Sequence, residues 1–294
     1  MAPHSPEAIK LLSFSIANSN ERRSGLLVDD NIFALEAPSL EECVAMPHDV
    51  LTRLIEESRE RSALPLSEVT LHAPVRPRKN VFCVGRNYQD HAAEGARTFG
   101  RELKIREVPE FFSKAVTAIA DPAATLKFQS SLSREYDWEG ELGVIIGQPG
   151  RDIAEKDALE HVFGYTCIND ITARNLQRAH GQWFKGKSLD QSCPIGPWIV
   201  TSDEIGDPQQ LTIEVQVNGD VKQRASTASM IFPVARIVAE LSRGMTLDPA
   251  DVIATGTPAG VGFARTPPEY LQNGDEVEVK IERIGTLRNT IAIA

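Results

Sequence analysis

The sequence predicts an α+β protein that is mostly β, with a mixed β-roll or sandwich as its main domain. Two observations carry this prediction. Apolar segments beyond about residue 74 are mostly short, and several alternate apolar and polar residues, as residues 211–217 do. This alternation is typical of a half-buried strand. The few helical segments do not alternate regularly with the strands, which disfavours a TIM barrel or a Rossmann sheet.

Residues 1–73 are predicted to form a small N-terminal α/β domain. Strands are expected at residues 9–16, 25–28 and 32–35, with a turn signal between the last two. Ser39 and Glu42 have the spacing of a helix capping box, and apolar residues recur at helical spacing over residues 50–55. Residues 71–80 contain two prolines and show no periodicity, so the domain boundary is placed near residue 74.

Residues 74–294 are predicted to form the main domain. Its expected strands are residues 81–85, 139–146, 163–169, 196–200, 211–217, 252–255, 276–281 and 286–293. The pair Asn218-Gly219 is a hairpin signal. Helices are expected near residues 154–161, 173–180 and 228–241, and a short one is expected after residue 88.

Charge and composition exclude several classes of protein. The chain has 294 residues and a formal net charge of −10, which argues against nucleic acid or an anionic membrane as a partner. No apolar run approaches the ~20 residues that span a bilayer. Residues 1–7 lack the pattern of a signal peptide or an organelle presequence, so a cytoplasmic location is expected. The four cysteines are scattered and form no Cys-x-x-Cys pair, which predicts small buried side chains rather than a zinc site or a disulfide framework.

Glu139 and Glu141 begin a predicted strand whose continuation is strongly apolar. Side chains two apart on a strand share a face, so the two carboxylates would repel each other unless a cation lay between them. Asp170 ends another short apolar segment and is a candidate third ligand. Three oxygen anions suit a hard divalent metal such as Mg²⁺. The alternative is that both glutamates lie on a solvated strand face beside lysines.

His91 and Glu94 are three residues apart on a predicted helix and would share one face, where the carboxylate could orient the imidazole as a general base. The alternative is an exposed polar helix face. Residues 95–104 contain glycines and basic residues, with one Phe that looks exposed, and could form a lid or an ordinary mobile loop.

Lys187 lies among apolar and glycine residues and could hold a substrate carboxylate or stabilise a developing enolate. The alternative is a surface lysine with an extended apolar stem. Residues 254–262 form a strand that runs into a glycine-rich turn, whose N–H groups and threonine hydroxyls could bind an anion. The turn is neither a Walker loop nor a GxGxxG segment that opens a helix.

Seven segments in order along residues 81–291 resemble the fumarylacetoacetate hydrolase family. They are Gly85-Arg86-Asn87-Tyr88 with His91 and Glu94, Phe112-Ser113-Lys114, Glu139-Gly140-Glu141, Asn169-Asp170 with Ala173-Arg174, Gly186-Lys187-Ser188, Cys193-Pro194 with Gly196-Pro197-Trp198, and Thr255-Gly256-Thr257-Pro258 with Gly260-Val261-Gly262. Each segment alone is weak evidence, whereas seven in register are strong and strengthen the metal prediction.

The resemblance implies a β-roll catalytic domain, a homodimer, and Mg²⁺ or Mn²⁺ held by Glu139, Glu141 and Asp170. The metal would chelate a small anionic dicarbonyl acid and polarise its oxygen. His91, oriented by Glu94, would deprotonate a water or the substrate. Lys187 would stabilise the enolate-like carbanion that leaves when a carbon–carbon bond breaks.

The resemblance also implies that Gly256 and Thr257 grip a substrate carboxylate, that Tyr88 contacts the substrate, and that the segment after Glu94 closes as a lid. One departure from the family is informative. The hydrolase that names the family places a further metal-binding aspartate two positions before its tyrosine, where this chain has Arg86. Arg86 could instead hold a substrate carboxylate. This favours the acylpyruvase, oxaloacetate decarboxylase and ring-cleavage-product hydrolase branches.

The first functional hypothesis is therefore a Mg²⁺- or Mn²⁺-dependent hydrolase or lyase that cleaves a carbon–carbon bond in an acylpyruvate- or oxaloacetate-type acid through a metal-bound enolate. The second is an isomerase, tautomerase or other lyase that acts on a dicarbonyl acid with the same metal site. The third is a non-catalytic binding protein of the same fold, which loss of His91, Glu94 or Lys187 would favour. All three residues are present.

Overall fold

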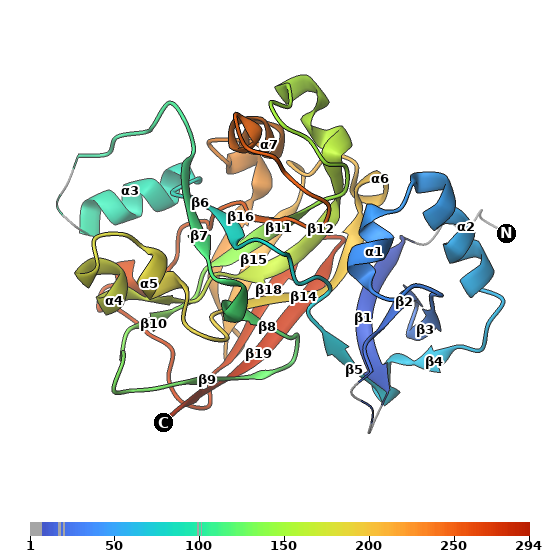
Figure 1. The fold of residues 1–294 in the computed structure, drawn as a ribbon. Helices are drawn as coiled ribbons and strands as arrows, with labels where there is room; N and C mark the ends of the chain where they lie inside the picture. The colour runs from blue at the N-terminus through green and yellow to red at the C-terminus, as the bar shows by residue number, and fades with distance from the viewer. Residues whose placement is uncertain (1–7, 17–18, 20, 99, 101) are drawn as a thin grey trace, which may run out of the picture.

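The computed structural model describes residues 8–16, 19, 21–98, 100 and 102–294. Within these residues the chain forms a large sheet of 12 strands, a smaller sheet of five strands, and a two-stranded ribbon. Helices are few and short. Figure 1 shows the N-terminal segment, in blue, at one side of the molecule and the helices α3, α4 and α5 at the opposite side. The fold class predicted from the sequence is confirmed.

The described residues up to residue 73 form an antiparallel sheet covered by two helices. Its strands are β1 (Lys10–Ile16), β2 (Arg23–Val28), β3 (Asn31–Ala34), β4 (Leu64–Pro65) and β5 (Val69–His72), and its helices are α1 (Leu40–Ala45) and α2 (His48–Ser58). The Ser39 hydroxyl accepts a hydrogen bond from the Glu42 N–H at 3.2 Å, so the predicted helix cap is confirmed. Capping satisfies one of the unpaired N–H groups in the first turn of α1.

The large sheet continues from this N-terminal segment into the rest of the chain. β1 pairs with β14 (Cys193–Thr201) through Lys10 opposite Val200, and the order then runs β14, β12, β11, β17, β6, β7. These strands are β12 (Val162–Asn169), β11 (Gly140–Ile146), β17 (Val252–Ala254), β6 (Val81–Gly85) and β7 (Glu110–Lys114), with β8 (Ile119–Ala120) beside β14. One sheet therefore contains strands from both sides of residue 74. The division into two domains at that residue stays a prediction.

The smaller sheet packs against the large one and completes a β-roll. Its order is β16 (Asp220–Ser226), β15 (Thr212–Val217), β18 (Glu276–Ile281), β19 (Gly285–Ile293) and β9 (Thr125–Phe128). One buried cluster joins Leu142 and Val144 of β11 to Val215 of β15 and Val279 of β18. The packing explains Gly140, because a Cβ there would lie 2.3 Å from a methyl carbon of Val215. The smaller sheet thus covers the face of β11 opposite Glu141.

Two predicted helices differ from the observed elements, and proline explains the first difference. The segment predicted as one helix over residues 228–241 is a 3₁₀ turn at Thr227–Ser229 followed by α7 (Val234–Ser242). Pro233 separates them because proline lacks the N–H that would continue a helix. The predicted helix near 154–161 is a 3₁₀ helix at Glu155–His161. Several observed strands were not predicted, among them β5, which overlaps the expected connection at residues 71–80, and β7, β9 and β16. β16 is largely polar and is the edge strand of its sheet.

The remaining helices are α3 (Gln89–Thr98), α4 (Arg174–Ala179), α5 (Phe184–Lys187) and α6 (Ser202–Ile205), and the ribbon pairs β10 (Tyr136–Asp137) with β13 (Thr172–Ala173). All four cysteines are free and buried, as predicted. No helix in the described part of the chain is long and apolar enough to cross a membrane. The homodimer, the absence of nucleic-acid and membrane partners, and the cytoplasmic location stay predictions.

Candidate active site

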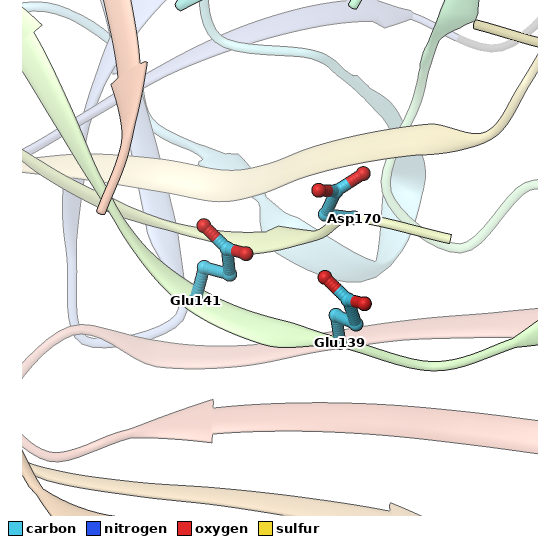
Figure 2. Close-up of side chains that lie close together, drawn as sticks. All are labelled: Glu139, Glu141 and Asp170. Atoms are coloured by element: carbon cyan, nitrogen blue, oxygen red, sulfur yellow. The ribbon is translucent and has the colours of Figure 1, made fainter. Parts of the chain in front are cut away.

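The three predicted metal ligands lie together at one end of the large sheet (Figure 2). Glu139 directly precedes β11, Glu141 is its second residue, and Asp170 directly follows β12. The register that pairs Gly140 with Asn169 brings these strand ends side by side. The ligand oxygens all lie within 4.8 Å of one another, and each side chain is at most 5% exposed. The alternative of a solvated strand face is therefore wrong.

Buried cations surround this cluster, which is called the carboxylate cluster below. The Lys187 Nζ lies 2.7 Å from Glu139 Oε2 and 2.6 Å from Asp170 Oδ2. Lys114, with a fully buried side chain, lies 2.6 Å from Asp170 Oδ1. Burial alone would lower the pKa of Lys187, but Asp170 and Glu139 raise it well above its usual value. Lys187 is therefore a permanent ammonium group, and the alternative of a surface lysine is wrong.

The surroundings shift the pKa values of Glu139 and Glu141 in opposite directions. Burial alone would raise the pKa of Glu139, but Lys187, Arg174 and His91 lower it to about 2. Burial, Asp170 and Glu139 together raise the pKa of Glu141 well above its usual range. Burial and the neighbouring carboxylates therefore disfavour the ionised form of Glu141, whereas nearby cations favour the ionised form of Glu139.

A hard divalent cation fits this donor set. Three buried carboxylates supply only oxygen ligands, which Mg²⁺ and Mn²⁺ prefer, and a cation among them would offset their mutual repulsion. The carboxylate cluster can therefore hold a divalent metal.

The predicted base pair forms on α3. His91 Nδ1 lies 3.4 Å from Glu94 Oε2, and the imidazole is only 10% exposed, so the alternative of an exposed helix face is wrong. Both oxygens of Glu94 also accept the N–H of Gly260, at 3.0 and 3.2 Å. These contacts fix the carboxylate, and with it the orientation of the imidazole ring.

A cavity of about 850 Å³ joins the base to the carboxylate cluster. It is lined by His91, Glu139, Glu141 and Lys187, together with residues of α3, α4 and α5. Residues of the segment 95–104, proposed as a lid, also line it, among them Gly95, Leu103 and Lys104. Phe99 and Arg101 of that segment lie outside the described residues. His91, Lys187, Glu139 and Glu141 therefore face one cavity, and Asp170 lies behind them beside Lys187.

The four predicted substrate-binding residues have different surroundings. Arg86 is half exposed at the cavity, 3.0 Å from Glu110 Oε2, and its guanidinium lies over the Trp183 ring. Tyr88 is buried, and its hydroxyl has no hydrogen-bond partner among the described residues. Burial and the nearby Glu141 charge raise its pKa well above the usual value.

Gly256 and Thr257 contact the protein's own groups. The Gly256 N–H donates to Glu141 Oε2 at 2.7 Å, and its φ of +98° is one that glycine adopts readily. The Thr257 hydroxyl donates to the Gly140 carbonyl and accepts from Gln223, although its side chain lines the cavity. The substrate-binding roles of all four residues stay predictions.

Sequence reasoning assigned no role to three charged residues around this site. They are Lys114, Arg174 and Asp137, each at most 4% exposed. Lys114 and Arg174 occur in the family-like segments, but local spacing does not show their partners. Asp137 was detectable, because it precedes Glu139 by two residues and continues the same alternation.

Three comparisons place this fold and site among known proteins. The Fumarylacetoacetate (FAA) hydrolase C-terminal family model matches residues 80–292. The oxaloacetate tautomerase YisK of Bacillus subtilis (strain 168) is 43% identical over 266 residues, which are 90% of this chain and 84% of that protein.

Two solved structures are similar along nearly the whole chain. A fumarylacetoacetate hydrolase from psychrophilic Exiguobacterium antarcticum has a TM-score of 0.83 and 41% identity, covering 98% of this chain and all of that chain (100%). A 2-hydroxyhepta-2,4-diene-1,7-dioate isomerase from Mycobacterium marinum has a TM-score of 0.77 and 32% identity, covering 97% and 99%. From its sequence, fold and relatives, this chain belongs to the fumarylacetoacetate hydrolase family.

Proposed function

We propose that this protein is a tautomerase that interconverts the keto and enol forms of a small dicarbonyl acid of the oxaloacetate type. The observation that carries the proposal is the imidazole of His91, which is held by Glu94 and shares one cavity with the carboxylate cluster. Such a reaction needs a proton to move between carbon and oxygen, and one oriented base beside a cation site is sufficient for that. The 43% identity to an oxaloacetate tautomerase supports the same reaction.

Glu139, Glu141 and Asp170 would hold Mg²⁺ or Mn²⁺. When bound, the ion supplies Lewis-acid polarisation of a carbonyl oxygen, which makes the neighbouring C–H more acidic.

The chain's own residues would move the proton. With Nδ1–H donating to Glu94, the free electron pair of His91 is on Nε2, which takes the proton from the carbon between the two carbonyl groups. The same imidazolium then returns its proton to the oxygen, so the proton count balances and no water is consumed. The Lys187 ammonium, which is held by Glu139 and Asp170, would offset the negative charge that develops on the oxygen.

Basic groups on the cavity wall suit an anionic substrate. Arg86, Lys104, Arg106 and Arg178 line the cavity in addition to Lys187. They give the cavity local positive charge although the whole chain carries a net charge of −10. A clustered positive charge of this kind attracts small anions to a cleft.

Carbon–carbon bond cleavage is the second candidate. The 41% identity to a solved fumarylacetoacetate hydrolase favours it, as does the resemblance in the sequence. In hydrolysis, His91 would take a proton from a water that attacks a carbonyl carbon, and the bond to the neighbouring carbon then breaks to release an enolate. In decarboxylation, that bond breaks to release carbon dioxide and leaves an enolate, which a proton converts to pyruvate. The two candidates therefore differ in their products.

Oxaloacetate and an acylpyruvate, supplied with Mg²⁺ or Mn²⁺, distinguish the candidates. Enol–keto exchange is followed by ultraviolet absorbance, and pyruvate by coupling to lactate dehydrogenase. A tautomerase accelerates the absorbance change and forms no pyruvate beyond the uncatalysed rate. Enzyme-dependent pyruvate from either acid would instead establish cleavage. If neither signal exceeds that of the His91→Gln variant, both candidates are wrong and a non-catalytic binding protein is favoured.

A further inference from the structure

Asp137 is a fully buried carboxylate that does not belong to the carboxylate cluster. It ends β10, two residues before Glu139. We propose that Asp137 is a positioning residue for the metal centre and acts through Arg174 on Glu139. This inference rests on the metal site of the proposed function, but not on which reaction the protein catalyses.

Three N–H groups hold the Asp137 carboxylate in one orientation. Oδ1 accepts from the Gly262 N–H at 2.7 Å, and Oδ2 accepts from the Phe263 N–H at 3.0 Å and from Arg174 Nε at 2.8 Å. The two backbone donors belong to the glycine-rich segment after β17. A carboxylate with three charge-assisted or backbone partners at these distances has little freedom to rotate.

Arg174 connects this carboxylate to the metal centre. Its Nη2 lies 2.7 Å from Glu139 Oε1, and its Nη1 donates to Gln177 at 3.2 Å. The guanidinium also stacks 4.4 Å from the centre of the Phe263 ring. A guanidinium is planar and its N–H groups form a rigid fork, so the hydrogen bond from Nε to Asp137 also sets the place of Nη2 beside Glu139, with which Nη2 makes an ion pair.

The two carboxylate oxygens of Glu139 have different partners. Arg174 lies beside Oε1, and Oε2 lies beside Lys187, which also contacts Asp170. If the Asp137 carboxylate were lost, the buried Arg174 charge would lack one of its two anions. The guanidinium would then be free to turn toward Glu139 and compete with a metal for both of its oxygens.

The contact between the Gly262 N–H and Asp137 requires a glycine at position 262. A Cβ at Gly262 would lie 1.9 Å from the Glu269 carbonyl oxygen and 2.8 Å from Asp137 Oδ1, so a larger residue would push the N–H away from the carboxylate. Gly260 of the same segment holds Glu94. One short stretch of backbone therefore aligns the partner of the base and, through Asp137 and Arg174, a metal ligand.

The test measures Mn²⁺ affinity by titration calorimetry on the full-length protein, without substrate. Asp137→Asn is expected to weaken Mn²⁺ binding about 10- to 100-fold, as losses of residues that orient metal ligands commonly do. The matched control is Asp251→Asn. Asp251 is also buried, accepts the Asp248 N–H at 2.8 Å and pairs with Lys79 at 2.9 Å, but it lies at the other end of β11, where its carbonyl accepts the Ile146 N–H.

A second variant separates positioning from general loss of stability. Arg174→Lys keeps the buried cation, but a lysine cannot bridge two carboxylates with a rigid fork. Its Mn²⁺ affinity should therefore fall by a factor similar to that of Asp137→Asn. The double variant should bind Mn²⁺ no more weakly than Arg174→Lys alone, because Asp137 acts through Arg174. Arg174→Lys also serves as the test if Asp137→Asn does not fold.

Four results would overturn the inference. They are an unchanged Mn²⁺ affinity in Asp137→Asn, an unchanged affinity in Arg174→Lys, an equal loss in Asp251→Asn, and additive losses in the double variant. If the wild-type protein binds neither Mn²⁺ nor Mg²⁺, both the metal centre of the proposed function and this inference are wrong. If the wild-type protein binds Mn²⁺ and the variants bind it with the same affinity, only this inference is wrong.

Discussion

Replacing Lys187 by methionine tests how the buried charges of the site are balanced. The change keeps most of the side-chain volume but removes an ammonium that lies 2.7 Å from Glu139 and 2.6 Å from Asp170. Breaking a buried ion pair by removing one partner costs about 3–5 kcal/mol, because the other charge stays buried without compensation. At about 2–4 °C per kcal/mol, the metal-free variant should melt roughly 6–20 °C below the wild type.

Added Mn²⁺ should return part of this loss. A ligand that binds only the native state stabilises it by about 2.7 kcal/mol at 100 times its dissociation constant. Without the Lys187 ammonium, a metal no longer competes for the oxygens of Glu139 and Asp170. The melting temperature should therefore rise more on Mn²⁺ addition in Lys187→Met than in the wild type.

The assay is thermal unfolding followed by circular dichroism, in chelator and in Mn²⁺. Lys185→Met is the matched control, because Lys185 is on the same short helix α5 but is exposed. It should melt with the wild type in both conditions. If Lys187→Met in chelator melts within 2 °C of Lys185→Met, on the order of 1 kcal/mol or less, the ammonium does not balance the carboxylates and the electrostatic account of the site is wrong.

Three further predictions follow from other parts of the structure. His91→Gln should slow the proton transfer about 10²–10⁴-fold in the absorbance assay and leave Mn²⁺ affinity unchanged, and an unaltered rate would exclude His91 as the base. Burial alone would raise the pKa of Asp121, but its N–H, imidazole and guanidinium partners lower it. The stability from its charge is present above the ordinary pKa of about 4 and is lost as pH falls through the lower folded pKa, so denaturation should show Asp121→Asn approaching wild-type stability at low pH. A stability difference independent of pH would contradict this. Gly262→Ala should lower the melting temperature because its Cβ would lie 1.9 Å from the Glu269 carbonyl oxygen, whereas Gly95→Ala on α3 meets nothing within 4 Å; equal melting of the two variants would show that the close approach is relieved easily.

Much of the fold was predictable because its signals are local. The alternation over residues 211–217 predicted β15, and Asn218-Gly219 predicted the hairpin in which both residues have positive φ, at 54° and 83°. The missed strands carry weaker signals. β16, the second strand of this hairpin, is largely polar and lies at an edge, so its own residues do not mark it as a strand. β9 alternates polar and buried residues, but it has only four residues and pairs with β19 from a distant part of the chain.

The sequence by itself determined the chemistry that the site can offer. The spacing of Glu139 and Glu141 on a strand placed two carboxylates on one face, and the spacing of His91 and Glu94 placed a base beside its partner. Both follow from the fixed geometry of a single strand or helix, in which neighbours along the chain set the direction of each side chain. The ordered family-like segments then supplied the third ligand and the lysine.

Only the tertiary structure decided how these groups balance one another. The register of β11 with β12 brings Asp170 beside Glu139, and the fold adds Lys114, Arg174 and Asp137 from separate segments. The ionisation of a buried carboxylate depends on the sum of burial and all nearby charges, whatever their distance along the chain. That sum is a property of the packed sheets, which is why spacing alone identified ligands but could not identify the buried residues that hold them in place.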